Sequence, residues 1–371
     1  MPLGLFLCGD VMTGRGIDQV LSWPSEPGLH EDWIKSALDY VRLAERKNGP
    51  IPRRVPPAYV WGDALAEFDR LKPAARIINL ETAVTGSEDR APKGINYRMH
   101  PRNLDCLTAA AIDCCVLANN HVLDWGRAGL EETLAVLHGA RIMTAGAGRN
   151  RGEAEKPAVL EPGGEGRVLV FAFAFSSSGV PWRWAAGNDM PGVRLLNDLS
   201  QGTVDEVGDI VGSHKAGRDT VVVSLHWGGN WGHDIEEREI RFAHGLIDHA
   251  GADLVHGHSS HHAKGIEVYR DKLILYGCGD LINDYEGIGG HERYRADLGL
   301  MYFPALAPGS GKLLGLELVP MQMCRFRLQR ASAADASWLC ATLTRESRRF
   351  GVALEPGSNG RLQLRWPAAS A

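Results

Sequence analysis

The chain has 371 residues, of which 44% are hydrophobic and 23% charged, a composition typical of one large globular α/β domain or of two domains. The net charge of −5 and the lack of a basic run argue against a nucleic-acid partner. No run approaches the roughly 18 apolar residues of a membrane span, and the N-terminus lacks the basic segment of a secretory signal. The seven cysteines include no Cys-x-x-Cys pair and favour a reducing compartment, so we expect a cytoplasmic protein without a membrane partner.

Short apolar runs in the first two thirds of the chain predict buried strands, and a polar cluster follows each of them. The first strand, residues 3–8, precedes Asp10. Residues 21–62 have the pattern of an insertion, with a charged helix and a Pro-rich turn that form either a solvated cover or a lid over the strand ends. Later strands precede Glu81, then residues 119–121, then His226, and then the histidines of segment 256–262. Ligands of open α/β sheets bind beyond the carboxyl ends of the strands, so these side chains should converge at one rim.

The remaining elements complete a layered α/β sandwich. Residues 219–258 predict a strand–helix–strand unit, and residues 264–280 predict a hairpin that turns at 270–271. Long alternating strands follow at 298–330, then a helix at 333–350 and a PAASA end that we expect to be disordered. We therefore predict one domain over residues 1–305 with the insertion at 21–62, and C-terminal strands and a helix over 306–371 packed on the same domain.

Several of the polar clusters are candidates for metal binding. Asp10 and Glu81 each follow a strand, where a carboxylate either caps a turn or ligates a metal. Asn120 offers an amide oxygen beside the acid/base imidazole of His121. The segment HGHSSHH holds four imidazoles in seven residues, which indicates metal or catalytic use, although its first histidine is also open to a packing role.

A Gly-rich segment near residue 290 is the other candidate site. It crowds acidic and basic side chains between two strands, and such Gly spacing permits close backbone approach. Arg295 is suited to carboxylate recognition, or equally to a structural pair with Asp297. Four tryptophans are candidates either for lining a pocket with an apolar or aromatic preference or for ordinary core packing: Trp182, Trp184, Trp227 and Trp231.

Taken together, the motifs resemble one known family. They are GDVMTGRG, INLETAVTG, INYRMHP, LANNHVLDWG, SLHWGGNWG, GHSSHHAKGIE and LYGCGDLINDY. In order and spacing, over roughly residues 3–305, they resemble the CapA family, the poly-γ-glutamate capsule-synthesis-like proteins of the calcineurin-like metallophosphatase superfamily. The resemblance implies a four-layer α-β-β-α sandwich with a metal site at the strand ends.

The resemblance also implies site residues. Its metal-ligand positions fall on Asp10, Glu81, Asn120, His226, His258 and His261, and its catalytic imidazole falls on His121. The chain departs from the superfamily pattern at Met12, where an imidazole is expected, and at Asn79-Leu80-Glu81, where a bridging Asp is expected. We therefore predict one divalent ion rather than two, with Ca²⁺ or Mn²⁺ favoured by the oxygen donors, Zn²⁺ acceptable to the histidines, and no organic cofactor.

One branch of the CapA-like proteins, the lasso peptide epimerases, inverts a Cα centre of a precursor peptide. Such an enzyme needs an acid and a base on opposite faces of Cα. We predict His121 and His291 as these two groups, with a peptide substrate, and with each histidine oriented by a carboxylate among Asp10, Asp124, Asp284 and Asp297. The alternatives are a metal-dependent hydrolase that cleaves phosphoesters or amides, and a non-catalytic module of polyglutamate assembly.

Overall fold

The computed structural model describes residues 1–163 and 166–367, so most of the PAASA end lies outside the described residues. The larger sheet has ten strands: β1 (Leu3–Val11), β2 (Ala75–Leu80), β5 (Cys114–Val116), β6 (Met143–Ala145), β16 (Asp280–Ile282), β17 (Leu298–Leu306), β18 (Leu313–Cys324), β19 (Arg327–Arg330), β20 (Ala353–Pro356) and β21 (Leu362–Arg365). The smaller sheet has seven: β8 (Ala158–Leu160), β9 (Val168–Phe175), β11 (Leu195–Leu196), β12 (Thr220–His226), β13 (Leu254–His258), β14 (Ile266–Tyr269) and β15 (Lys272–Leu275). Two short pairs are β3 (Ala83–Val84) with β4 (Arg98–Met99), and β7 (Ala147–Gly148) with β10 (Gly192–Val193).

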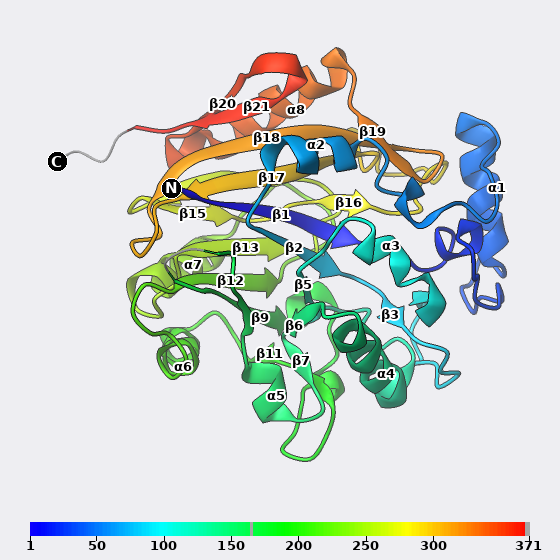
Figure 1. Ribbon diagram of the computed structural model, residues 1–371, viewed down its shortest axis with the longest axis horizontal. Helices are drawn as coiled ribbons and strands as arrows, with labels where there is room; N and C mark the ends of the chain where they lie inside the picture. The colour runs from blue at the N-terminus through cyan, green and yellow to red at the C-terminus, as the bar shows by residue number, and fades with distance from the viewer. Residues whose placement is uncertain (164–165, 368–371) are drawn as a thin grey trace.

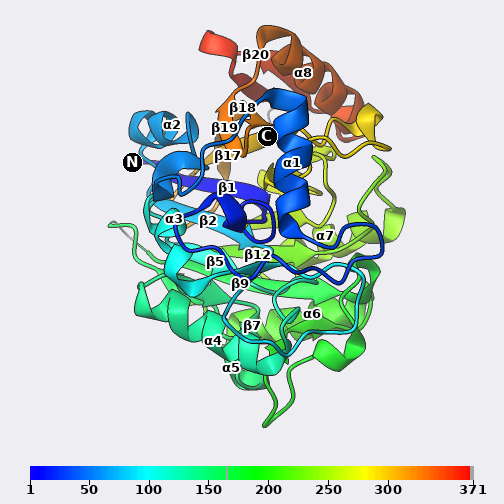
Figure 2. The same ribbon diagram turned by 90° about the vertical axis from the view of Figure 1, so that its right-hand side faces the viewer.

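The α-helices lie mostly outside these sheets (Figures 1 and 2). They are α1 (Ala37–Asn48), α2 (Ala64–Leu71), α3 (Asp105–Thr108), α4 (Gly126–Gly139), α5 (Arg151–Glu155), α6 (Gln201–Gly212), α7 (Glu237–Asp248) and α8 (Ala333–Ser347). None of the helices within the described residues has the length and apolarity that crossing a membrane requires.

Alternating side chains of the strands build the layers. In β9, Val170 and Ala172 join the core between the two sheets, whereas Leu169 and Phe171 pack with apolar residues of α6 and α7 on the outer face. On the outer face of the larger sheet, Phe6 of β1 meets Phe68 of α2 edge to face, with 4.7 Å between the ring centroids. The predicted four-layer sandwich of helices, sheet, sheet and helices is therefore confirmed.

Parallel pairing brings the predicted polar clusters to one rim. β1, β2 and β5 run parallel to one another, as do β9, β12 and β13 in the other sheet. The register places His226 opposite His258, and Asp10 of β1 opposite Asp280 of β16. The carboxyl ends of both sheets thus supply side chains to the same region, as expected from the sequence.

Two local predictions are refined by the structure. The hairpin between β14 and β15 turns at Arg270 and Asp271 as predicted, and both have positive φ (47° and 63°), the backbone required by the tightest hairpins. The helix of the 21–62 insertion begins later than its charged pattern suggests, because Ser36 caps α1 by accepting a hydrogen bond from the Leu38 backbone (3.3 Å). α1 stands at the edge of the molecule, beyond the ends of β1 and β16 (Figure 1).

Candidate metal centre

Two overlapping groups of buried side chains have the spacing of a metal site. Asp10 with His226 and His258 forms one group, and Asp10 with His261 and Asp280 forms the other. Within each group, ligand atoms lie within 4.8 Å of one another, and every residue is buried. Asp10 is shared, so the two groups make one continuous centre at the rim where β1, β12 and β13 end and β16 begins.

Several predicted ligands keep a buried polar atom without a hydrogen-bond partner among the described residues. These atoms are Oδ2 of Asp10, Oδ1 of Asn120 and Nε2 of His226. Buried polar atoms are nearly always paired, and an unpaired one costs about 1–3 kcal/mol. A carboxylate oxygen, an amide oxygen and an imidazole nitrogen are all donors to divalent ions, so the residues present fit a metal.

The charge balance of the centre also favours a cation. Burial, together with the neighbouring Asp280 carboxylate, raises the pKa of Asp10 to about 7. Burial likewise raises the pKa of Glu81 well above its ordinary value, and the Asp10 carboxylate adds to this effect. Glu81 lies near both flanking imidazoles, 3.9 Å from His121 Nε2 and 4.0 Å from His226 Nδ1. Ionised carboxylates at this depth need a compensating positive charge.

Amides and a hydroxyl fix the orientation of the candidate ligands. Asn79 donates to Asp10 Oδ1 (2.7 Å) and to Glu81 Oε2 (3.0 Å), and Asn119 in turn donates to Asn79 Oδ1 (3.0 Å). His258 has both ring nitrogens engaged, Nε2 with Ser224 Oγ (2.8 Å) and Nδ1 with His226 Nδ1 (2.8 Å). Metal binding by His258 would therefore replace one of these contacts.

His121 forms a dyad with a buried carboxylate beside the centre. Its Nδ1 lies 2.6 Å from Asp124 Oδ2, and Lys93 Nζ lies 2.8 Å from the other oxygen of Asp124. Burial lowers the pKa of His121 to about 4, although Asp124 opposes that shift. The sequence left four carboxylates as candidates for orienting His121, and the structure places Asp124 in that position. The Nε2 atom is left facing Glu81.

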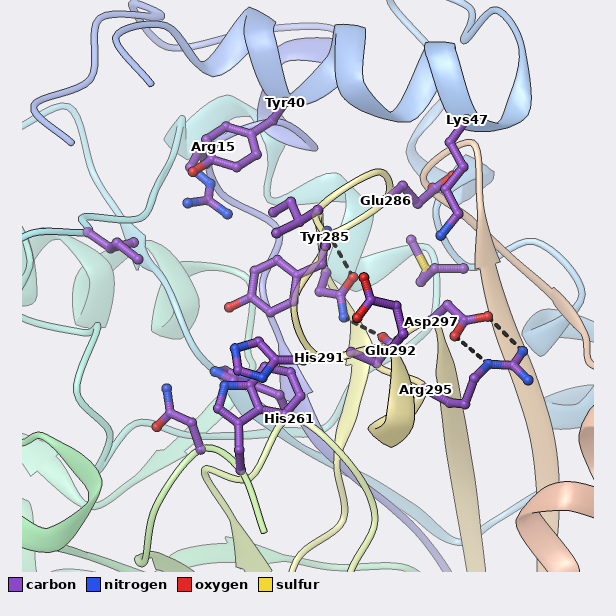
Figure 3. Close-up of a pocket in the computed structure, with 18 residues that line it drawn as sticks. Arg15, Tyr40, Lys47, His261, Tyr285, Glu286, His291, Glu292, Arg295 and Asp297 are labelled. Atoms are coloured by element: carbon purple, nitrogen blue, oxygen red, sulfur yellow. Dashed lines mark hydrogen bonds and ion pairs between the residues drawn. The ribbon is translucent and has the colours of Figure 1, made fainter. Parts of the chain in front are cut away.

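A second dyad joins His261 to Asp280, with 2.9 Å between Nδ1 and Oδ1. Burial by itself lowers the pKa of His261, but the Asp280 carboxylate outweighs it and raises the pKa above the ordinary value. His261 also borders a cavity of about 490 Å³. Figure 3 shows Tyr40 and Lys47 reaching toward this cavity from α1, so the insertion forms one of its walls.

The predicted second proton-transfer group, His291, lines the same cavity. It is exposed and stacks on Trp231, with ring centroids 4.0 Å apart. No carboxylate of the described residues hydrogen-bonds to its ring, so the carboxylate that we expected to orient it is absent from this arrangement. The Trp231 ring also contacts His261, with 5.3 Å between the centroids, so both histidines border the cavity beside this tryptophan.

Two predicted carboxylates do not orient a histidine. Asp284 is fully buried and pairs with Arg15 through two hydrogen bonds of 2.8 and 2.6 Å. Asp297 binds Arg295 (2.8 and 2.9 Å) and Gln322 (2.9 Å). These assignments were wrong because a guanidinium satisfies each carboxylate. Arg295 lines the cavity, but its guanidinium is bound to Asp297 and to Asp335 (2.8 Å). It therefore has the structural pairing with Asp297 that the sequence offered as an alternative to carboxylate recognition.

The four tryptophans divide between core and surface. Trp227 was wrongly placed at the pocket, because it is 4% exposed, stacks on Tyr276 and packs in the cluster beneath α7. Trp184 is also buried, in the main core, and was wrongly assigned as well. Trp182 is 54% exposed and does not line the cavity. Trp231 lines the cavity beside His261.

The sequence reasoning assigned no role to Asn79, Lys93, Asp280 or Arg15. Asn79 belongs to β2, and Glu81 directly follows that strand two residues later, so period-two alternation carried one residue past the strand could have placed both side chains on one face. Asp280 directly follows the apolar run LILYGCG, the same signal that identified Asp10. Lys93 and Arg15 carry no comparable local signal, because their partners come from distant segments.

Comparisons with known proteins bear on the family of the chain. Residues 4–285 match the model of a family described as "Bacterial capsule synthesis protein PGA_cap". A "Probable polyglutamine synthesis accessory protein" of Mycobacterium tuberculosis is 49% identical over 94% of this chain and 92% of its own length. The "Capsule biosynthesis protein CapA" of Bacillus anthracis is 27% identical over 53% of this chain and 46% of its own length. A solved structure titled as a novel phosphatase of Mycoplasma pneumoniae has a TM-score of 0.48 and 10% identity, over 87% of this chain and 94% of that chain.

Proposed function

Because the chain belongs to the bacterial capsule synthesis protein PGA_cap family, we propose that it is a metal-dependent hydrolase that cleaves amide bonds in an acidic glutamyl polymer of the poly-γ-glutamate type. The observation that carries the proposal is the set of buried, unpaired ligand atoms on Asp10, Asn120 and His226, next to the His121–Asp124 dyad. A divalent ion held by such donors supplies Lewis acidity, which polarises a carbonyl oxygen and acidifies water.

The side chains around that centre have separate roles in this proposal. Asp124 holds the Nδ1 proton of His121 and so fixes the tautomer. Nε2 is then free to take a proton from the attacking water and to pass that proton to the departing amine. Asn79 orients the carboxylates of Asp10 and Glu81. The cavity that α1 walls on one side borders the centre at His261, so it offers room for the substrate next to the candidate ligands.

A peptide epimerase of the lasso type is the second candidate. The observation that favours it is the presence of two histidine–carboxylate dyads at one site, His121–Asp124 and His261–Asp280. His261 has the orienting carboxylate that His291 lacks, so it replaces His291 as the second group in this version. A cytoplasmic location and a peptide substrate belong to this candidate as proposals.

One assay separates the two candidates. Metal-loaded protein is incubated with poly-γ-glutamate in D₂O, and new amine ends, Cα deuterium and residue chirality are measured. A hydrolase releases amines without Cα exchange, whereas an epimerase incorporates deuterium and inverts chirality without cleavage. His121→Ala should abolish whichever activity is present. Cleavage of simple phosphate esters in place of amides would contradict the proposed substrate.

A further inference from the structure

A second hollow lies outside the metal centre, near the start of α3. It has a volume of about 330 Å³ and is lined by Ser22, Trp23, Pro24, Arg54, His100 and Arg102. None of these residues is a carboxylate, although the chain as a whole has a net charge of −5. The hollow is therefore a local positive patch on an acidic protein.

The basic side chains of the hollow keep their donors free. Arg54 and Arg102 are exposed, and neither side chain has a hydrogen bond or ion pair within the described part of the chain. The guanidinium of Arg102 lies over the Trp23 ring, 3.2 Å from its centroid, and this stacking leaves the N–H edges open. His100 Nδ1 accepts from the Arg102 backbone (3.1 Å), so the neutral ring carries its proton on Nε2 and offers a third donor.

Buried polar contacts hold the backbone around the hollow. Asp18 is fully buried and accepts from the backbones of Ser25 (2.7 Å) and His100 (2.9 Å) and from the Asn103 amide (2.7 Å). Asn103 also clamps the backbone of Trp23, at its N–H (3.0 Å) and its carbonyl (2.9 Å). The hollow is thus formed before any ligand arrives, which lowers the entropic cost of binding.

The insertion contributes residues both to the hollow and to the cavity that His261 borders. Trp23 and Arg54 stand near the two ends of segment 21–62, and the middle of that segment, α1, carries Tyr40 and Lys47 into the cavity. Figure 2 shows α1 and α3 on the same face of the molecule. A chain bound at the metal centre can therefore continue along this face to the hollow.

We propose that this hollow is an additional subsite that binds the free α-carboxylates of an acidic glutamyl polymer through Arg54, Arg102 and His100. Guanidinium groups match carboxylates in geometry and charge, and a polymer with one carboxylate per residue presents them repeatedly. The inference rests on the proposed function for the identity of the polymer. The subsite predicts that long polymer chains bind with higher affinity than short ones, because only a long chain reaches both the metal centre and the hollow.

The test compares matched double variants of the full-length protein. Arg54→Gln/Arg102→Gln removes two charges from the hollow, and Arg141→Gln/Arg241→Gln removes two from exposed positions outside both sites. Fluorescence anisotropy measures the binding of labelled poly-γ-glutamate and of a γ-glutamyl dipeptide at low and at moderate salt. We expect the first variant to bind the polymer about tenfold or more weakly than wild type, with a flatter salt dependence. The control variant should match wild type, and the dipeptide should bind all three proteins equally.

Each other outcome has a defined meaning. Equal polymer binding by the two double variants overturns the subsite, and it leaves the proposed function intact if wild type still cleaves the polymer. Tighter binding of an RNA oligomer of the same charge overturns the carboxylate assignment. Arginine-dependent polymer binding without cleavage by metal-loaded wild type supports the subsite and overturns the proposed function.

Discussion

Replacement of Arg15 by Met should strongly destabilise the protein. The Arg15 side chain is 1% exposed and joins three segments: it pairs with Asp284, binds Glu31 (3.0 Å) and stacks over Tyr40, 3.5 Å from the ring centroid. Arg15→Met keeps much of the side-chain volume. Among the described residues, it leaves the fully buried Asp284 carboxylate with only the Gly16 backbone N–H (2.8 Å) as a partner. The positive φ of 52° at residue 15 is equally unfavourable for Met and Arg, so it cancels in the comparison.

The expected loss can be estimated from these contacts. Breaking a buried ion pair by removing one partner costs about 3–5 kcal/mol, because an uncompensated charge stays buried. The lost cation–π contact adds about 1–2 kcal/mol. The free energy of unfolding of native proteins is about 5–15 kcal/mol, so this single substitution should remove a large share of it.

Urea denaturation at pH 7 measures the effect. The matched control is Arg53→Met, which breaks an exposed pair with Glu45 (41% and 27% exposed side chains) and should cost about 0–1 kcal/mol. Arg15→Met/Asp284→Asn removes the stranded charge and should recover much of the loss, so the reasoning stays testable if the single variant does not fold. A loss for Arg15→Met no larger than for Arg53→Met would refute it.

Three other predictions address the centre, the tryptophans and pH. His226→Ala should lose the bound metal, measured as ions per chain by elemental analysis, and with it any metal-dependent rise in melting temperature; two tightly held ions in wild type would contradict the single-ion prediction. Trp227→Ala should cost about 3–5 kcal/mol in urea denaturation because it empties a core position, whereas Trp231→Ala should stay within about 1 kcal/mol and weaken substrate affinity. Arg167 hydrogen bonds lower the pKa of Asp219 from 3.8 to about 2, so the folded state binds fewer protons than the unfolded state between these values. The ionised Asp219 therefore stabilises the folded state fully above pH 3.8, and this stabilisation disappears as the pH falls through 2. Asp219→Asn should lower the free energy of unfolding by about 1 kcal/mol at pH 7 and by almost nothing near pH 2. An equal loss at both pH values would contradict this prediction.

The sequence by itself determined the layers and the location of the candidate centre. Apolar runs predict strands, and parallel strands carry their carboxyl ends to one edge, so Asp10, Glu81, His226 and His258 had to approach one another. The His121–Asp124 dyad was also predictable, because both residues belong to one turn. These features depend on local pattern and on a general rule of sheet topology.

Tertiary structure alone decided which charged groups pair. Asp284 meets Arg15 across 269 residues of sequence, and nothing near either residue encodes that contact. Asp297 had candidate partners on both sides, and the neighbouring strand β18 settled its environment through Gln322. Whether Trp227 is buried or lines the cavity depended on which face of its segment α7 covers. Side-chain pairing over long range follows from how the layers pack, because any buried charge is satisfied by whichever opposite charge the packing brings within reach.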